Sequence, residues 1–589
     1  MFTTDVPRKL TGPVIVSVPT VPAPPGSIVP AWLNVTLPTF SVPDPLTVPA
    51  AAFVMVYPAC TDDACNIHRA DEDEKNPSRA RAYDELLFRH WTQWEDGLRS
   101  HLFVVPVAGG AAKDLTQGKD YDTPVPPFGG SADYAFSPDG KEMAFTTRIG
   151  TDQAWTTNND IYAVPVTGGE PVNLTASMKG TEQTPAYSPD GKLMAFLSQE
   201  RAGFESDRVR LMVRDRQTGA VREIPKGYDR SIGEYMWAGS DFFAITEDRQ
   251  RHEILHITAA GDVHHVLRED SLNPGQLSAG MAGEIPMLTF MSDDIANPGN
   301  VYTWLVDHVA RPKAVTSLNA EKLRSIAMNP ADEIKWRGAE GDTVYGLLVK
   351  PPQFQEGRKY PLVVLVHGGP QGAWLDQFHG RWNAQMFAAP GYVVFLPNPR
   401  GSTGFGQQFL DEVSRDWGGR AYADIMTGVD AVARLPFVDS TRMAAAGGSY
   451  GGYMVNWMEG HTNRFKTLIN HAGVFNLESM GGATEELWFT EWEFGGPMWG
   501  SQADYQKWSP HRFAGQFKTP MLVIHGEQDF RVPYTEGLQV FTALRRQGVP
   551  ARLLMFPDEG HWISRPQNQV RWNTEVRDWL GKYLQVPVP

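Results

Sequence analysis

A serine between glycines is the first chemical signal in this chain. Ser449 lies in Gly447-Gly448-Ser449-Tyr450-Gly451, which fits the pattern G-x-S-x-G. The apolar run 443–446 before it predicts a buried strand, and residues 453–459 after it predict a helix. Strand, sharp turn and helix are the setting of a nucleophile elbow, where small neighbours leave room for a strained backbone. A glycine-rich turn with an ordinary serine is the alternative that the five residues alone leave open.

A serine hydroxyl becomes nucleophilic only when a base takes its proton, and a histidine oriented by a carboxylate does this near neutral pH. Two later strand ends supply these groups. The segment 521–524 leads to Asp529, and the segment 551–556 leads to His561. Serine, acid and histidine in this chain order are typical of nucleophile-elbow enzymes. We therefore predict Ser449 as nucleophile, Asp529 as orienter and His561 as base.

Neighbouring residues compete for two of these roles. Glu527 and Asp558 lie in the same two loops and are alternative carboxylates. His525 lies at the strand end, so we expect it to pack beneath the site. His461, His471 and His511 lack this strand-end context.

An oxyanion needs two hydrogen-bond donors. One is expected to be the amide of Tyr450, the residue after the nucleophile. The other is expected from the loop after an early strand, His367-Gly368-Gly369-Pro370, where we choose the amide of Gly369. A tight loop selected for its shape alone is the alternative.

Alternating strands and helices position these residues. From about residue 335 the chain alternates apolar strands with helical stretches, which predicts a parallel sheet covered on both faces. We assign residues 333–589 to an α/β catalytic domain with a mostly parallel sheet.

The first half carries repeats. Residues 135–145 recur as residues 186–196, each reading as a strand, a Pro-Asp-Gly turn and a second strand. Repeats of 40–50 residues that are mostly strand predict a β-propeller, here six or seven blades over residues 53–332. A β-sandwich with two chance hairpins is the alternative. Residues 1–52 are rich in proline and predict an extended arm or partial blade.

Composition excludes several classes of partner. The formal net charge of the 589 residues is −15, which does not favour nucleic acid or an anionic membrane. No run of 18 apolar residues exists, so no membrane span is expected, and the N-terminal residues lack a secretory pattern. Cys60 and Cys65 could form a small disulfide or be free thiols, so the compartment, cytoplasmic or periplasmic/secreted, stays open. No metal or cofactor is expected.

Four stretches together resemble a known family. They are His367 to Pro370, Pro399 to Gly406, Gly448 to Met454, and His525 to Pro533 with Gly560-His561. Their order and spacing resemble the prolyl oligopeptidase family of serine peptidases, in which a propeller is fused to an α/β-hydrolase. Residues 89–94 and 487–496 are similar to the acylaminoacyl-peptidase and dipeptidyl-peptidase V branch. The dipeptidyl-peptidase IV branch has a tyrosine where this chain has His367, which favours the former branch.

The resemblance implies a substrate class and further site residues. It implies short peptides as substrates, because the propeller excludes folded chains, and self-association through the hydrolase domain. Arg531 matches an arginine that binds a substrate carbonyl. A dipeptidyl enzyme also needs an acid for the free N-terminal ammonium, and the candidates are Glu95, Glu491 and Glu493. A solvated acidic surface is the alternative for all three.

Together these patterns predict a serine exopeptidase that releases dipeptides through an acyl-enzyme. Two alternatives keep the same triad, an acylaminoacyl peptidase and a carboxylesterase. A third alternative is a propeller binding module with an inactive hydrolase domain.

Overall fold

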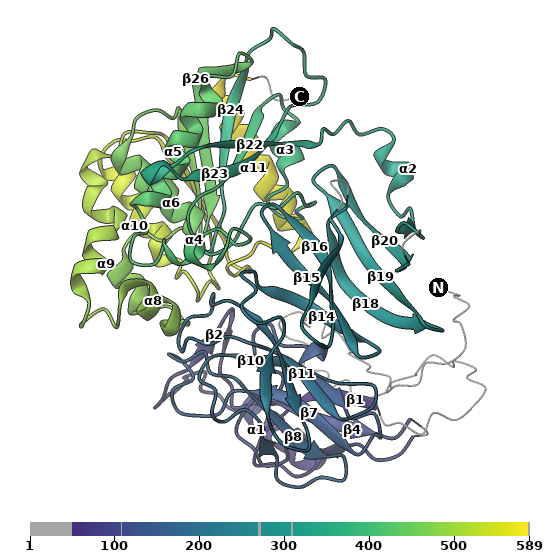
Figure 1. Ribbon diagram of the computed structural model, residues 1–589. Coiled ribbons are helices and arrows are strands. Elements are labelled where there is room, and N and C mark those ends of the chain that lie inside the picture. The colour runs from purple at the N-terminus through teal and green to yellow at the C-terminus, as the bar shows by residue number, and fades with distance from the viewer. Residues whose placement is uncertain (1–49, 108, 269–271, 308–309, 587–589) are drawn as a thin grey trace.

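The computed structural model of the chain describes residues 50–107, 109–268, 272–307 and 310–586. The proline-rich segment falls almost wholly on residues 1–49, so its prediction lies outside the described residues. In Figure 1 the C-terminal half, green to yellow, lies at the upper left, and the strands of the first half lie below it and to its right.

The C-terminal half is built on one eight-stranded sheet. Its strand order is β22-β23-β25-β24-β26-β27-β28-β29. The first two pairings are antiparallel and the others are parallel. The strands are β22 (Ala331–Arg337), β23 (Thr343–Val349), β24 (Tyr360–Val366), β25 (Val393–Asn398), β26 (Val438–Gly448), β27 (Thr467–His471), β28 (Met521–Gly526) and β29 (Ala551–Phe556).

Helices cover both faces of this sheet. The side chains of β24 alternate, so that Leu362 and Val364 join one core while Val363 and Leu365 join the other. The first core includes α5 (Arg420–Ala433), α6 (Tyr450–His461) and α10 (Thr535–Arg546), and the second includes α3 (Ala384–Ala388) and α11 (Pro566–Leu584). Shorter helices α4 (Gln407–Asp411), α7 (Leu477–Gly481), α8 (Leu487–Phe494) and α9 (Gln502–Trp508) lie in the connections. Apolar strands covered on two sides are what a parallel sheet requires.

The first half folds into consecutive antiparallel sheets. One has the order β1-β4-β5, and four others join β6 to β9, β10 to β13, β14 to β17 and β18 to β21 in chain order. Their strands are β1 (Ala50–Val56), β4 (Arg99–Val105), β5 (Lys113–Asp114), β6 (Tyr134–Phe136), β7 (Glu142–Thr147), β8 (Asp160–Pro165), β9 (Val172–Asn173), β10 (Glu182–Tyr187), β11 (Leu193–Ser198), β12 (Arg210–Asp215), β13 (Val221–Glu223), β14 (Ile232–Ala238), β15 (Asp241–Asp248), β16 (Arg251–Ile257), β17 (Val263–Leu267), β18 (Pro274–Ala282), β19 (Ile285–Asp294), β20 (Asn297–Leu305) and β21 (Lys313–Ala314). A separate two-stranded ribbon pairs β2 (Arg89–His90) with β3 (Gln93–Trp94).

The sequence repeat corresponds to two hairpins, β6–β7 and β10–β11. In the first turn the hydroxyl of Ser137 donates to Asp139 at 2.7 Å, and the glycine that follows has a φ of +68°. In the second turn Ser188 donates to Asp190 at the same distance, and its glycine has a φ of +71°. Glycine adopts this left-handed conformation without steric cost, so the repeated Pro-Asp-Gly fixes both turns.

The described residues supply five blade-like sheets, whereas the repeat length predicts six or seven blades. The blade count therefore stays a prediction. The predicted domain limits, 53–332 and 333–589, stay predictions too, beside observed sheets that begin at Ala50 and at Ala331.

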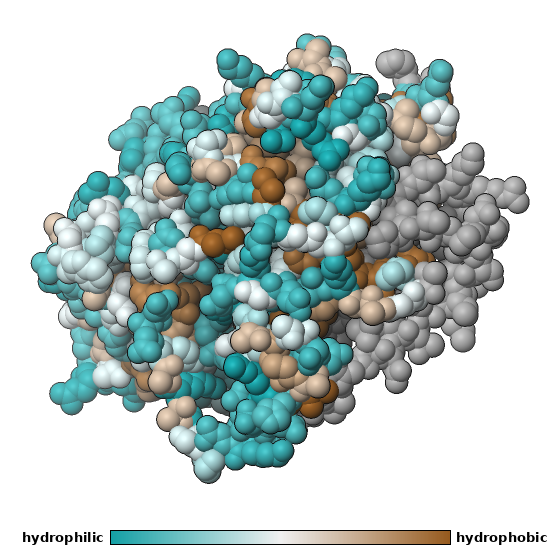
Figure 2. All heavy atoms as spheres, turned by 90° about the horizontal axis from the view of Figure 1, so that it is seen from below, coloured by the Kyte–Doolittle hydropathy of each residue, from teal (hydrophilic) through white to brown (hydrophobic). Residues whose placement is uncertain are grey.

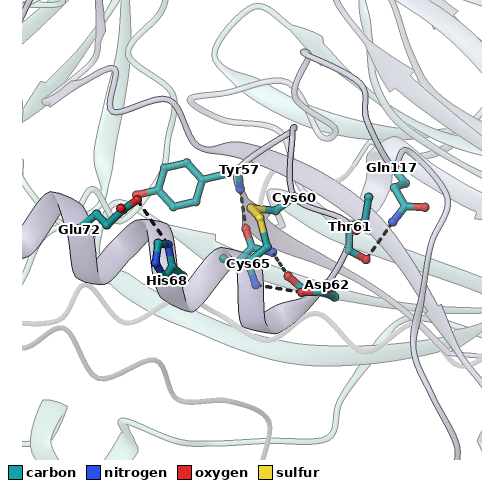
Figure 3. The surroundings of a disulfide bond; sticks show 9 residues. Tyr57, Cys60, Thr61, Asp62, Cys65, His68, Glu72 and Gln117 are labelled. Carbon is teal, nitrogen blue, oxygen red and sulfur yellow. Dashed lines mark hydrogen bonds and ion pairs between the residues drawn. A yellow bond between two sulfur atoms is a disulfide. The ribbon is translucent and has the colours of Figure 1, made fainter.

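A disulfide fixes the start of α1 (Asp63–Lys75) in the first half (Figure 3). It joins Cys60 to Cys65 and so answers the question that the sequence left open. Asp62 caps the same helix by accepting from the amide of Cys65 at 2.9 Å. The bond and the cap act on one turn, because both involve Cys65.

The face of the molecule shown in Figure 2 is mostly hydrophilic, with apolar patches between the polar side chains. Across the described residues, no helix combines the length and apolar character needed to cross a bilayer.

Candidate active site

Ser449 lies in the strained turn between β26 and α6. Its backbone has φ +57° and ψ −121°, which side-chain-bearing residues rarely adopt. Its amide donates to the carbonyl of His471 at the end of β27, at 3.0 Å. As the residue immediately before α6, it lies where the helix dipole and free amides favour negative charge.

Both flanking glycines are required by close backbone approach. A Cβ on Gly447 would lie 2.4 Å from the carbonyl of Gly451, and a Cβ on Gly451 would lie 2.1 Å from the carbonyl oxygen of Val366. No side chain fits at such distances, so the spacing of the motif has a steric cause.

Asp529 and His561 meet in the loops after β28 and β29. The Nδ1 of His561 lies 2.7 Å from Oδ2 of Asp529, and both side chains are buried. The other carboxylate oxygen, Oδ1, accepts from the amides of Arg531 and Val532 at 3.1 and 2.9 Å. Burial by itself would raise the pKa of Asp529, but the interactions with His561 and His525 hold it well below its ordinary value. The carboxylate therefore stays ionised and orients the imidazole.

The competing residues have other partners. Glu527 is exposed, and Asp558 accepts from Asn568 at 3.0 Å. His525 is fully buried, with Nε2 2.8 Å from the carbonyl of Val532. It thus packs below the Asp529 loop, in the manner expected of it.

The loop after β24 runs beside the serine. A Cβ on Gly368 would lie 3.3 Å from Cβ of Ser449, so this backbone approaches Ser449 closely. The neighbouring Gly369 has a φ of +120°. His367 is buried, with Nδ1 2.8 Å from the carbonyl of Gly368 and Nε2 3.0 Å from the hydroxyl of Ser402. These two contacts of His367 hold the loop in place.

The β2–β3 ribbon packs directly on the histidine and acid loops, and in Figure 1 β2 lies at the junction of the two halves. The amide of Phe530 donates to the carbonyl of Trp91 at 3.3 Å. A Cβ on Gly560 would lie 2.1 Å from the side chain of Thr92. The Trp91 ring lies 5.9 Å from that of His561. A segment of the first half therefore forms one wall of the site.

A profile described as the prolyl oligopeptidase family matches residues 377–587. Dipeptidyl-peptidase 5 of Schizosaccharomyces pombe is 34% identical over 543 residues, covering 87% of this chain and 76% of the relative. Dipeptidyl-peptidase 5 of Porphyromonas gingivalis is 33% identical over 524 residues, covering 86% of this chain and 75% of the relative. The chain belongs to the prolyl oligopeptidase family.

As a member of this family it is a serine peptidase. Among solved structures, an acylaminoacyl peptidase of Pyrococcus horikoshii matches with a TM-score of 0.72 at 20% identity, covering 86% of this chain and 77% of that one. The expected fold class, a propeller joined to an α/β-hydrolase, is confirmed.

In this prolyl oligopeptidase family member, Arg531 lies against two acids that sequence reasoning missed. The carboxylate of Glu485 accepts from its guanidinium at 2.9 Å, and a carboxylate oxygen of Glu486 lies 3.0 Å from Nε. Glu485 and Glu486 are only 2% and 4% exposed. The available signal was an acidic doublet directly before the apolar segment 487–489, because paired charges beside large apolar residues are seldom left without a partner.

The three acids that the sequence singled out have surroundings different from those of the two acids beside Arg531. Glu95 pairs with Arg99 at 2.8 Å. Glu493 is buried and accepts from Trp417, Gln371 and Ser414 at 2.7, 2.8 and 2.9 Å. Glu491 is partly buried, and burial raises its pKa. Within the described ranges, no group of three or more His, Cys, Asp or Glu side chains is arranged to hold a metal ion.

Proposed function

We propose that the protein is a serine dipeptidyl peptidase that releases dipeptides from free N-termini. Ser449 attacks the carbonyl of the second residue, His561 takes its proton and later delivers it to the leaving amine, and Asp529 orients His561. The amides of Tyr450 and Gly369 stabilise the oxyanion. The strained serine and the 2.7 Å contact between His561 and Asp529 support these roles.

The acid pair beside Arg531 is the observation that favours a free N-terminus. Burial raises the pKa of Glu485 and of Glu486, although the charge of Arg531 opposes this rise. Glu205 adds a third negative charge near both groups, while Arg148 and Arg89 add positive charge near Glu485. Oε2 of Glu485 accepts no hydrogen bond from the described residues. Nε2 of His90 lies 3.3 Å from this oxygen, and burial lowers the pKa of His90 to about 3, so its imidazole is neutral. A substrate ammonium would supply charged donors to this oxygen.

Arg531 is then free to donate its remaining N–H groups to the first carbonyl of the substrate. Its Cζ lies 4.8 Å over the Trp91 ring, which fixes the plane of the guanidinium. An ammonium at the acids, a carbonyl at Arg531 and a scissile bond at Ser449 place cleavage after the second residue. The names of the relatives, dipeptidyl-peptidase 5, agree with this length.

A matched substrate panel tests the proposal. It compares dipeptidyl p-nitroanilides with a free N-terminus, the same compounds with an N-acetyl group, and a small p-nitrophenyl ester. We expect kcat/KM for the free amines to exceed that of the acetylated compounds by at least about tenfold, equal to about 1.4 kcal/mol. Preference for the acetylated compounds would instead identify an acylaminoacyl peptidase, and hydrolysis of the ester alone a carboxylesterase. No hydrolysis of any compound by the pure protein would favour a binding module.

Self-association through the hydrolase domain remains part of the proposal. Met386 on α3 and Val570 on α11 are exposed and line one groove between these helices. Light scattering of the pure protein measures the assembly directly.

A further inference from the structure

Arg381 is an arginine beside the site whose charge is not balanced locally. Its Cζ lies 4.4 Å over the ring of Trp562, the residue after His561. Among the residues that the structure describes, no carboxylate forms an ion pair with it. Its side chain is partly buried, and burial lowers its pKa. A guanidinium stays protonated in proteins, so this is a fixed positive charge.

The charge of Arg381 acts on two histidines, His379 and His471. Burial is the main cause that lowers the pKa of His379 to about 4, and the charge of Arg381 contributes to this decrease. The charge of Arg381 also acts on His471, whose carbonyl accepts a hydrogen bond from the amide of Ser449. The adjacent residue, Trp382, borders the elbow, since a Cβ on Gly448 would lie 3.1 Å from its ring. Arg381 therefore lies beside the elbow in sequence and beside the histidine loop in space.

An aromatic platform connects Arg381 with Arg531. We define it as Trp91, Phe128 and Trp562. The Trp91 ring lies 5.1 Å from Phe128 and 4.9 Å from Trp562, and the latter two stack at 5.7 Å. Phe128 is 59% exposed and Trp562 is 40% exposed, although they adjoin each other. A contiguous exposed aromatic surface next to a catalytic histidine is typical of a substrate-binding wall.

The platform has two different ends. Arg531 lies over Trp91 with its acid pair, which is the end proposed for the substrate ammonium. Arg381 lies over Trp562, and no acid of the described chain pairs with it there. His561 delivers its proton to the leaving amine, so the side beyond His561 holds the residues after the scissile bond.

The span between the two ends fits a short peptide. Ring distances of 4.8 Å from Arg531 to Trp91, 4.9 Å on to Trp562 and 4.4 Å to Arg381 limit the separation of the two guanidinium carbons to about 14 Å. An extended chain covers roughly 3.3–3.6 Å per residue, so no more than about four residues lie between the two ends.

We propose that Arg381 binds the C-terminal carboxylate of the leaving portion of tripeptide and tetrapeptide substrates, with the platform under the leaving residue. This inference rests on the proposed dipeptidyl-peptidase function and specifies its substrate length. A planar guanidinium pairs with a carboxylate through two parallel N–H···O bonds, and stacking on Trp562 fixes the plane in advance.

The experiment compares peptide acids with peptide amides. Ala-Ala-Ala and Ala-Ala-Ala-Ala are used with a free carboxylate and with a C-terminal amide, and products are quantified by mass spectrometry. Ala-Ala-p-nitroanilide, which has no carboxylate, measures the chemistry alone. The proteins are wild type, Arg381→Gln, Arg381→Lys and the control Arg464→Gln, which removes an arginine paired with Asp430 at 2.7 Å.

We expect wild type to prefer the acids over the amides by about tenfold in kcat/KM. Arg381→Gln should reduce that ratio to about one, Arg381→Lys should keep an intermediate ratio, and Arg464→Gln should keep the full ratio. The ratio is compared within each variant, so that p-nitroanilide hydrolysis reports separately any effect of the Arg381 variants on the chemistry, and it should change less than threefold in Arg464→Gln. Equal rates for acids and amides in wild type, or an unchanged ratio in Arg381→Gln, would overturn the proposal.

Two further measurements distinguish a terminal from a side-chain carboxylate, and a binding defect from a folding defect. Ala-Ala-Glu-amide carries only a side-chain carboxylate, and an Arg381→Gln variant that loses only its preference for this peptide refutes the terminal-carboxylate assignment. Loss of folding is recognised by thermal unfolding and by fluorophosphonate labelling, and Arg381→Lys then carries the test. Failure of wild type to cleave any peptide with a free N-terminus, while it cleaves esters, would refute the proposed function rather than the role of Arg381.

Discussion

Replacing each acid of the pair by its isosteric amide tests the recognition of the N-terminus. In Glu485→Gln and Glu486→Gln the volume is unchanged and one carbonyl oxygen remains to accept from Arg531. What disappears is one buried negative charge and with it one charged acceptor for the substrate ammonium. The remaining acid still pairs with Arg531, so the ammonium finds one charged acceptor fewer.

The magnitude follows from burial and distance. Two unit charges about 3 Å apart at an effective dielectric constant of ~20 attract by about 5.5 kcal/mol, from which the desolvation of the ammonium must be subtracted. Truncation of one partner in a buried charged hydrogen bond costs about 2–5 kcal/mol. We take ~3 kcal/mol, which corresponds to a loss of about 100-fold in kcat/KM for free amines. Exposures of 2% and 4% justify using the buried limit for both acids.

The assay is the ratio of kcat/KM for a dipeptidyl p-nitroanilide to that for a p-nitrophenyl ester, measured on each variant. The ester requires the triad and not the ammonium site. A matched control is Glu493→Gln, because Glu493 is equally buried on the neighbouring α8 but is satisfied by three donors. Glu95→Gln and Glu491→Gln extend the control to the other two acids that the sequence singled out. These controls should keep the ratio within threefold.

The pH profile supplies a second measurement. Both acids have raised pKa values in the free enzyme, so cleavage of free amines should weaken as pH falls and they become protonated. It should weaken again above about pH 8, where the peptide α-amino group loses its proton. The ester should lack this second decrease. A ratio that stays at the wild-type value in both variants, or that falls in Glu493→Gln instead, refutes the acid-pair reasoning.

The remaining expectations concern the triad, stability and the disulfide. Ser449→Ala should abolish turnover and fluorophosphonate labelling, and labelling elsewhere in the chain would refute the assignment. Asp529→Asn should lower kcat by about 10⁴-fold without unfolding the protein, since the imidazole loses its orienting acceptor; stopped-flow assays and circular dichroism measure both. Burial raises the pKa of Glu493 to about 7 from an ordinary 4.5, so its contribution to stability is complete below pH 4.5 and is lost as pH rises through 7. Glu493→Gln should therefore flatten that part of the unfolding profile by about 3 kcal/mol in denaturant titrations, and an unchanged slope contradicts it. Cys60→Ser should destabilise the start of α1 by about 2 kcal/mol in hydrogen exchange with activity unchanged, whereas unchanged protection would show that the bond adds no stability.

The sequence within a few residues was sufficient to predict the elbow at Ser449. It was also sufficient to predict that Asp529 and His561 follow the ends of strands. Gly447 and Gly451 were predictable because their backbone neighbours leave no space for a Cβ. The G-x-S-x-G motif requires glycine at both positions for this reason. The alternation of apolar strands with helices indicated a parallel sheet, and the edge where parallel strands end is where Asp529 and His561 had to lie. The turns of the two repeated hairpins could likewise be predicted from a few consecutive residues.

The acid pair proposed to hold an ammonium could not be found in this way. Glu95, Glu491, Glu493, Glu485 and Glu486 are the same residue type in the same acidic chain. Only the packed structure shows that Glu493 is fully hydrogen-bonded while Glu485 and Glu486 share one arginine. The number of partners depends on contacts between residues 46 to 122 positions apart in the chain, which no short sequence window contains.

The sequence by itself determined which bond-breaking chemistry the chain can carry, because that chemistry depends on residue types and on steric limits within a few residues. The tertiary structure decided what surrounds this chemistry. It placed the β2–β3 ribbon against the histidine loop, assembled Trp91, Phe128 and Trp562 into one surface, and left Arg381 without a counter-ion among the described residues. Charge balance and contact across a site are properties of distances in space, and those distances are set only when both halves of the chain pack together.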